Sequence, residues 1–168
     1  WGRGLFDEWG VDAITVNPYV GGDAVRPLLA GQPEKAVYVL ARTSNPGARQ
    51  FQGDLNTGRG LSAEVLRAGG DWTTADGGHV GFVIGATYPT ELAIARELAP
   101  RASFLIPGIG AQGGSLAAAV AHGSDRVAGP VINSGRSILF ASSGTDFAEA
   151  ARAAALLLRD EINVLRGE

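Results

Sequence analysis

Two glycine-containing loops carry the residue types that bind phosphate. The first, Pro107–Gly114 (PGIGAQGG), follows an apolar run and precedes a helix-like run. Its glycines allow backbone N–H groups to turn toward an anion at the start of a helix, although they also suit a tight turn without a ligand. The second loop, Asn133–Ser137, offers the Gly135 amide and the Arg136 guanidinium, which is suited to bidentate phosphate contact. Together the loops predict a site for a phosphorylated small molecule, with Gln112 reaching from one loop and Arg136 from the other.

The first loop also matches a dinucleotide-binding pattern. From Gly108 onward it spells G-x-G-x-x-G, but that fingerprint needs an acidic residue about 20 positions further on. Asn133 and Ser134 stand there instead, which disfavours NAD. Because Arg136 could accommodate a 2'-phosphate, an NADP-dependent reductase remains an alternative.

Polar side chains also follow two earlier apolar runs. Thr43 and Ser44 come after one run and Asn17 comes after another. Such groups can hydrogen-bond the polar edge of a base or sugar. The Ser-Asn-Pro-Gly segment that begins at Ser44 is equally a turn signature, so a purely structural role stays open.

Short apolar runs alternate with helix-like runs along the chain, which predicts a parallel α/β sheet in a single domain, residues 1–168. The expected strands, interpreted as buried on both faces, are Val11–Asn17, Ala36–Arg42, Val80–Ala86, Ser103–Pro107 and Val131–Asn133. The expected helices are Ala24–Ala30, Thr57–Ala68, Leu92–Leu98, Ser115–His122 and Asp146–Leu165, with Gly69–Gly78 as a surface excursion. Such units fit either an open flavodoxin-like sheet or part of a β/α barrel. A complete barrel typically needs about 250 residues, more than the 168 of this chain. In a β/α barrel the last two strand-to-helix loops commonly form the phosphate site. The two candidate phosphate loops are also the last two in this chain, which favours the barrel.

Composition excludes several classes of function. The chain has 168 residues, a net charge of −3 and no cysteine, and it lacks the long apolar run of a membrane span and the basic stripe of a nucleic-acid surface. Two separated histidines make a metal cluster improbable on sequence grounds. The single lysine, Lys35, precedes a strand and is interpreted as a solvated loop charge.

Several segments together resemble a known family. Val11–Tyr19, Leu40–Gly47, Val83–Thr87, Pro107–Gly114 and Asn133–Arg136 occur here in one order. They are similar to the orotidine 5'-phosphate decarboxylases, in particular the longer bacterial subfamily. The resemblance implies a TIM (β/α)8 barrel that converts orotidine 5'-monophosphate to uridine 5'-monophosphate (UMP) without a cofactor, as a cytoplasmic homodimer in pyrimidine biosynthesis.

The resemblance also implies residue roles. Ser44 would contact the amide edge of the pyrimidine, and Gln112, in a mobile loop, would touch the phosphate and the pyrimidine side. The Gly135 amide and Arg136 would hold the phosphate. Thr43 and Asn17 complete the expected substrate-binding set.

One departure from the family is large. The Asp-x-Lys-x-x-Asp motif of the family's reacting centre does not occur in this sequence, so no catalytic residue is assigned. The chain also begins at Trp1 and contains no methionine. We therefore expect strands four to eight of a barrel, the C-terminal portion of a longer protein, inactive alone. Another phosphosugar-binding barrel enzyme, an isomerase or synthase, and a non-catalytic fragment remain alternatives.

Overall fold

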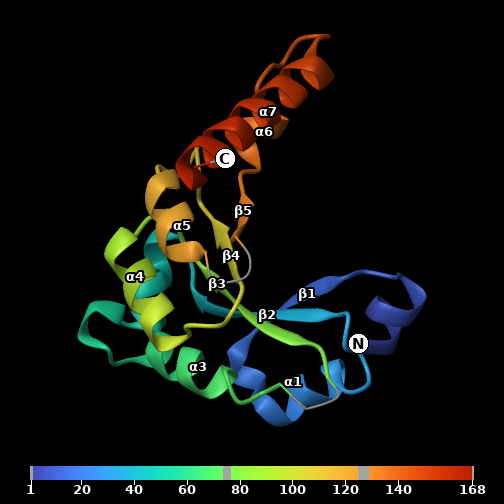
Figure 1. The fold of residues 1–168 in the computed structure, drawn as a ribbon, viewed down its shortest axis with the longest axis vertical. Helices are drawn as coiled ribbons and strands as arrows, with labels where there is room; N and C mark the ends of the chain where they lie inside the picture. Colours follow the sequence, from blue (N-terminus) through green and yellow to red (C-terminus); the bar gives the residue numbers. More distant parts are fainter. Residues whose placement is uncertain (1, 74–76, 125–128, 168) are drawn as a thin grey trace.

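The computed structural model describes residues 2–73, 77–124 and 129–167. Within them the strands form a single parallel sheet in which each strand pairs with the next one in the chain (Figure 1). The strands are β1 (Ala13–Val16), β2 (Ala36–Arg42), β3 (His79–Ile84), β4 (Phe104–Pro107) and β5 (Val131–Asn133). All five predicted strands are confirmed. The sequential order excludes the flavodoxin-like alternative, because that fold reverses its strand order at a switch point whereas a β/α barrel does not.

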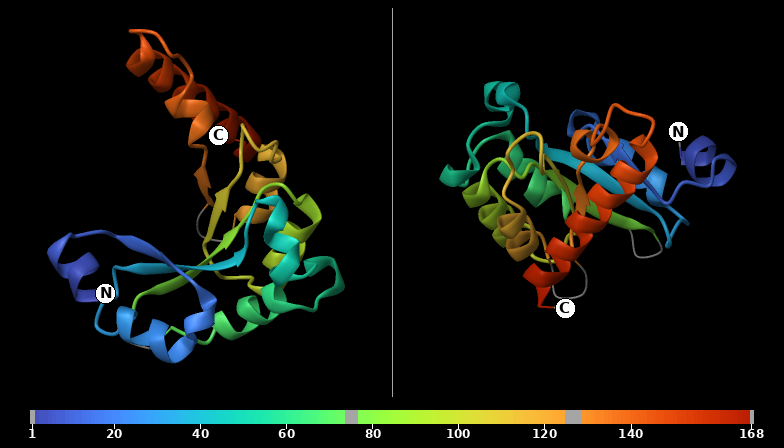
Figure 2. Two further views of the ribbon diagram at one scale, coloured as in Figure 1. Left: turned by 180° about the vertical axis from the view of Figure 1, so that it is seen from behind. Right: turned by 90° about the horizontal axis from the view of Figure 1, so that it is seen from above.

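Helices connect successive strands. They are α1 (Gly22–Leu29), α2 (Arg49–Gln52), α3 (Leu61–Gly69), α4 (Pro89–Leu98), α5 (Leu116–Gly123), α6 (Arg136–Leu139) and α7 (Phe147–Arg166). A π-helical segment, Arg3–Glu8, precedes β1, and short 3-10 turns lie at Pro18–Val20, Pro46–Ala48 and Leu55–Thr57. In the views of Figures 1 and 2, α7 extends away from the body of the sheet beyond β5.

Two helix starts show how local sequence sets the boundaries. Ser115 caps α5, since its hydroxyl accepts the Ala118 N–H at 3.2 Å. The predicted start of α3 at Thr57 is wrong, because α3 begins at Leu61. Gly58 and Gly60 have φ of 62° and 89°, values that a right-handed helix does not use.

The core lies between the sheet and the helices α1, α3, α4 and α5. Along β2, Val37 and Val39 are buried and their neighbours are only half-buried, so one face of this strand meets the helices and the other does not. Phe82 and Phe104 extend the buried face into β3 and β4. Burial of every strand on both faces is therefore wrong. The physical reason is that the described residues put helices against one face only and leave β1 and β5 as edges.

The segment between α3 and β3 is not wholly a surface excursion. Trp72 is buried, and its indole packs against the start of α1, so closely that a Cβ on Gly22 would lie 2.6 Å from its Nε1. The prediction of an exposed loop is wrong at this residue, because a large apolar ring closes the gap between α1 and α3. Residues 74–76 of the predicted loop lie outside the described residues.

Arg96 joins α4, α5 and the start of β4. Its guanidinium donates to the carbonyl oxygens of His122 at 3.0 Å, Gly123 at 2.7 Å and Ala102 at 2.8 Å. The same group lies 3.8 Å from the centre of the Phe104 ring. It thereby satisfies carbonyls at the end of α5 that have no partner within the helix. This anchorage fixes the helices that precede and follow the Pro107–Gly114 loop.

Candidate functional site

A pocket of about 480 Å³ lies at the carboxyl ends of the strands. Ser44 follows β2, Thr87 and Tyr88 follow β3, Gln112 follows β4, and Arg136 follows β5. Asn45 and Pro46 complete the lining. Because all strands are parallel, these loops meet at one edge of the sheet, where ligands of α/β proteins bind. The volume suits a ligand of nucleotide size.

The loop after β4 depends on glycines for its path. Gly108 and Gly110 have φ of 103° and 80°, in the region that favours glycine. The loop closes on itself, since the Gly114 N–H donates to the Gly108 carbonyl at 3.0 Å. A Cβ on Gly114 would lie 2.5 Å from the Ala86 Cβ, so the loop also packs tightly against the exit of β3. Gln112, in the middle of this loop, is exposed and lines the pocket.

Two serines tie the loop after β4 to the loop after β5. The Ala111 N–H donates to the Ser137 hydroxyl at 3.0 Å, and the Ser134 hydroxyl donates to the Ile109 carbonyl at 3.2 Å. The two predicted phosphate loops are therefore held together as a unit. The sequence interpretation did not assign this role to either serine, although hydroxyls flanking Gly135-Arg136 were a visible signal.

Ser44 occupies a crowded position between two glycines. A Cβ on Gly85 would lie 2.7 Å from the Ser44 backbone nitrogen, and one on Gly108 would lie 3.1 Å from the Ser44 Cβ. The Ser44 carbonyl accepts the Thr87 hydroxyl at 3.3 Å. The backbone at Ser44 is thus fixed from both neighbouring loops, which preorganises its hydroxyl at the pocket.

Arg136 and Gln112 line the same pocket from different loops. Arg136 is the first residue of α6, and its exposed guanidinium has no ion-pair partner among residues 2–73, 77–124 and 129–167. Gln112 is also exposed. Gly135, which precedes α6, has open space where a Cβ would stand. The pocket therefore combines a cation and an amide at its mouth, which is the chemistry that an anionic ligand requires.

Asn17 and Thr43 line a separate, neighbouring cavity of about 160 Å³. The Asn17 side chain accepts the Tyr19 N–H at 3.0 Å and so caps a 3-10 turn. The Thr43 hydroxyl hydrogen-bonds Asn45 at 2.6 Å and Gln52 at 2.9 Å. The structure thus brings Ser44, Gln112 and Arg136 together and gives the other two side chains internal partners; a substrate contact by Asn17 or Thr43 stays a prediction.

A buried ion pair stands behind the pocket wall and was not anticipated. Arg42, the last residue of β2, pairs with Glu91 in the first turn of α4, and both side chains are essentially inaccessible to solvent. The Arg42 guanidinium also lies 4.4 Å from the centre of the Tyr88 ring, which lines the pocket. Strand alternation would have placed Arg42 on the face opposite Ala41, so the sequence pattern did not reveal the pair.

The amino ends of the strands, opposite the pocket, carry a lysine in a surface ion pair. Lys35 directly precedes β2, and its Nζ lies 3.5 Å from a carboxylate oxygen of Asp12. The Lys35 side chain is 20% exposed and that of Asp12 is 97% exposed, so the lysine is a partly covered charge in a surface ion pair, more covered than the solvated loop charge that was expected. The lysine lies at the amino end of its strand, far along the sheet from the pocket residues.

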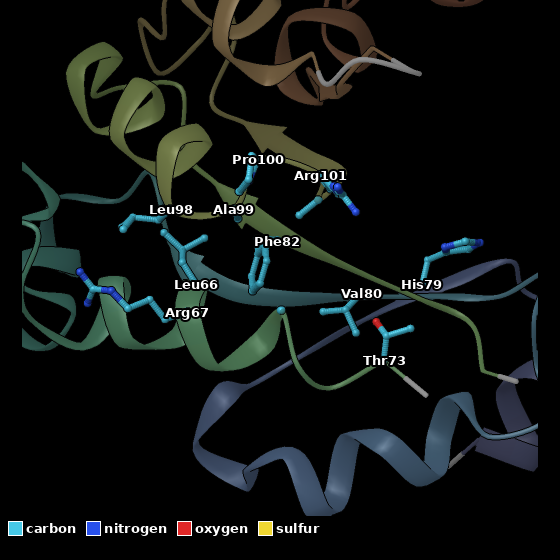
Figure 3. Close-up of a pocket in the computed structure, with 12 residues that line it drawn as sticks. Leu66, Arg67, Thr73, His79, Val80, Phe82, Leu98, Ala99, Pro100 and Arg101 are labelled. Atoms are coloured by element: carbon cyan, nitrogen blue, oxygen red, sulfur yellow. The ribbon is translucent and has the colours of Figure 1, made fainter. Parts of the chain in front are cut away.

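A second cavity of about 310 Å³ lies near the starts of β3 and β4. Figure 3 shows the apolar side chains of Leu66, Phe82 and Leu98 close together in it, with Arg101 and His79 to one side. Its two arginines, Arg67 and Arg101, lie on opposite sides of the apolar group in this view. None of the predicted site residues lines it.

The described residues hold neither a metal-binding cluster nor a membrane-spanning helix. Among residues 2–73, 77–124 and 129–167, no three His, Asp or Glu side chains are grouped closely enough to hold a metal ion. Within the same residues no helix has the length and apolarity needed to cross a membrane.

The fold and the site define a class: part of a β/α barrel whose ligand pocket is built from the loops after its parallel strands. Residues 4–154 match the model of the orotidine 5'-phosphate decarboxylase / HUMPS family, and the chain belongs to this family. The membership favours the family suggested by the sequence over an NADP-dependent reductase. Because the family fold is a TIM barrel, the five-stranded sheet is part of such a barrel.

Individual relatives carry the same family name. The chain is 48% identical over 163 residues to the orotidine 5'-phosphate decarboxylase of Azoarcus sp., covering 96% of this chain and 59% of the relative. It is 44% identical over 175 residues to that of Thermomicrobium roseum, with coverage of 100% and 60%. The solved structure of Leishmania donovani OMP decarboxylase superimposes with a TM-score of 0.81 at 36% identity, covering 99% of this chain and 62% of that one. The chain thus spans about 60% of the length of the curated relatives it matches.

Proposed function

We propose that this chain forms the phosphate-gripping and pyrimidine-contacting part of an orotidine 5'-phosphate decarboxylase. The observation that carries the proposal is the convergence of Ser44, Gln112 and Arg136, from the loops after three different strands, on one pocket. Family membership and the names of the relatives supply the reaction: orotidine 5'-monophosphate loses carbon dioxide to give UMP.

Each residue has a role in this proposal. Arg136 and the Gly135 amide hold the phosphate, and Gln112 spans the phosphate and the pyrimidine side. Ser44 contacts the amide edge of the base. Binding energy from the phosphate, which is remote from the reacting carbon, is available to close the site and stabilise the transition state. A cytoplasmic homodimer in pyrimidine biosynthesis is part of the same proposal.

Proton transfer to the pyrimidine carbon needs groups that this sequence does not supply as a motif. It contains no Asp-x-Lys-x-x-Asp segment, and Lys35 lies at the amino end of β2, away from the pocket at the carboxyl ends of the strands. We therefore assign this chain to binding and orientation and assign no proton donor within it. On this proposal the chain alone binds nucleotide but does not decarboxylate it.

The test is a calorimetric titration of the chain with UMP and with uridine, before and after Arg136→Ala. The substitution should weaken UMP binding by about ten- to hundredfold, because a charge-assisted hydrogen bond contributes about 1.5–3 kcal/mol, and should leave uridine binding unchanged. Arg152→Ala, at an exposed arginine of α7, is the matched control and should change neither affinity. Equal losses for UMP and uridine would refute the phosphate role of Arg136.

A further inference from the structure

The pocket wall formed by Ser44, Thr87 and Tyr88 is supported from behind by the Arg42–Glu91 ion pair. Arg42 lies two positions before Ser44, and Glu91 lies three positions after Tyr88. The pair therefore connects the loop after β2 with the loop after β3. Ser44, on the first of these loops, is the residue proposed to contact the amide edge of the base, whereas the residues proposed to hold the phosphate follow β4 and β5.

A local irregularity in β2 puts Arg42 in this place. Leu40 pairs with Val83 and Arg42 pairs with Ile84, so Ala41 is an extra residue in the ladder between β2 and β3. As a result Ala41 and Arg42 are both buried, which breaks the alternation seen earlier in the strand. Bulges of this kind re-aim a side chain next to a functional site. Here the bulge turns the guanidinium toward Glu91 of α4.

The contacts of Arg42 extend from Glu91 to the pocket lining itself. Its Nη2 donates to Glu91 Oε1 at 3.3 Å and its Nε donates to Oε2, while the guanidinium plane is stacked near the Tyr88 ring. The Arg42 carbonyl accepts the Gly85 N–H at 2.7 Å. Within the described residues, Arg42 Nη1 is buried without a hydrogen-bond partner. One side chain thus fixes Tyr88 and the backbone of both loops at a cost in unmet hydrogen bonding.

That cost argues against stability as the reason for the pair. A buried ion pair is often no more stabilising than well-packed apolar residues of similar volume, because both charges lose their hydration. A remaining unpartnered donor makes the balance worse. The planar guanidinium of Arg42, with its directed N–H donors, holds the two loops in one relative orientation. An apolar pair of similar volume would not fix that orientation.

We propose that Arg42 and Glu91 are positioning residues that set the base-side wall of the pocket and thereby its selectivity for a pyrimidine nucleotide over a simple sugar phosphate. The proposal rests on the proposed function, since it assumes that Ser44 meets the pyrimidine. It assigns to the pair no contact with the phosphate and no direct contact with the ligand.

The experiment compares three variants of the full 168-residue chain: Glu91→Gln, the double substitution Arg42→Met with Glu91→Leu, and Glu64→Gln. The last removes the charge of Glu64 from the exposed Arg67–Glu64 pair of α3 and is the matched control. Each variant is titrated with UMP and with ribose 5-phosphate. Amide hydrogen exchange is followed in residues 43–45 and 85–88 without any ligand, and thermal unfolding is recorded in parallel. The double variant keeps the test informative if an unpaired buried charge unfolds Glu91→Gln.

The expected result is about a tenfold loss of UMP affinity in Glu91→Gln and in the double variant, with ribose 5-phosphate affinity within twofold of wild type. Exchange in both segments should become faster, and Glu64→Gln should match wild type throughout. Unchanged UMP affinity in the folded double variant would overturn the proposal. Equal loss of both ligands would also overturn it, because the pair would then be merely structural.

Failure of the proposed function gives a different pattern. If wild type does not bind UMP but the variants still accelerate exchange in residues 43–45 and 85–88, the proposed function fails while the positioning of the two loops stands. If wild type does not bind UMP and exchange is unaffected, both fail.

Discussion

Gln112 and Arg136 approach one ligand pocket with different chemistry. Arg136 carries a fixed charge on the first residue of α6, whereas Gln112 offers a neutral amide from a glycine-rich loop. A neutral hydrogen bond contributes about 0.5–1.5 kcal/mol and one to a charged group about twice as much. The two side chains should therefore differ in how strongly their loss weakens nucleotide binding.

For Gln112→Ala we expect a two- to tenfold rise in the Kd for UMP, a smaller loss than for Arg136→Ala, because the amide carries no charge of its own. Isothermal titration of the chain measures it. Gln50→Ala, at an exposed glutamine of the short helix α2, serves as control and should leave the Kd unchanged. If Gln112→Ala binds UMP as tightly as wild type, Gln112 is not part of the site.

The common location of three candidate residues was predictable from the sequence, whereas their contacts with a substrate stay predictions. Ser44, Gln112 and Arg136 were predictable as neighbours, because parallel strands bring the loops after their carboxyl ends to one edge. Arg42 was not predictable, since the bulge that turns it toward Glu91 depends on how β2 and β3 pair. Thr43 shows that a position after a strand does not by itself indicate a ligand contact. Its hydroxyl already hydrogen-bonds Asn45 and Gln52 within the protein.

At the scale of elements, the loops after β4 and β5 act as one unit because Ser134 and Ser137 bond across them. The loop after β4 is also pressed against the exit of β3 at Gly114. Its shape therefore depends on a contact between elements and not only on its own glycines. The sequence predicted the loop and the helix that follows it, yet the serine bonds needed the folded arrangement of β4 and β5.

The glycine pair Gly114 and Gly4 tests this dependence. Gly114→Ala would place a Cβ 2.5 Å from the Ala86 Cβ and 2.6 Å from the Gly108 carbonyl oxygen. Overpacking of this kind costs about 1–3 kcal/mol, so we expect a lower melting temperature together with weaker UMP binding. Gly4→Ala is the matched control, since Gly4 lies in the segment Arg3–Glu8, outside the pocket, and its Cβ would meet open space. Calorimetric melting and titration give both readouts, and an unchanged Gly114→Ala variant would show that the loop adapts at no cost.

At the scale of the whole molecule, the strand order was predictable only in part. Alternating strands and helices predicted a parallel sheet, but the choice between an open doubly wound sheet and part of a barrel came from the two phosphate loops. The order β1-β2-β3-β4-β5 settles that choice for the described residues. Large apolar side chains such as Leu139, Phe140 and Phe147 are exposed around α6 and α7. The chain spans about 60% of the length of the curated relatives it matches, in agreement with a sheet that is part of a barrel.

The most direct measurement is the rate of carbon dioxide release from orotidine 5'-monophosphate by two proteins. One is this chain alone, and the other is a chimera that joins it to the portion of the Azoarcus sp. relative that it does not match. We predict no decarboxylation by the chain alone, decarboxylation by the chimera, and a marked loss in the chimera on Arg136→Ala. A folded chimera that binds UMP but releases no carbon dioxide, or one whose rate ignores Arg136→Ala, would contradict the account.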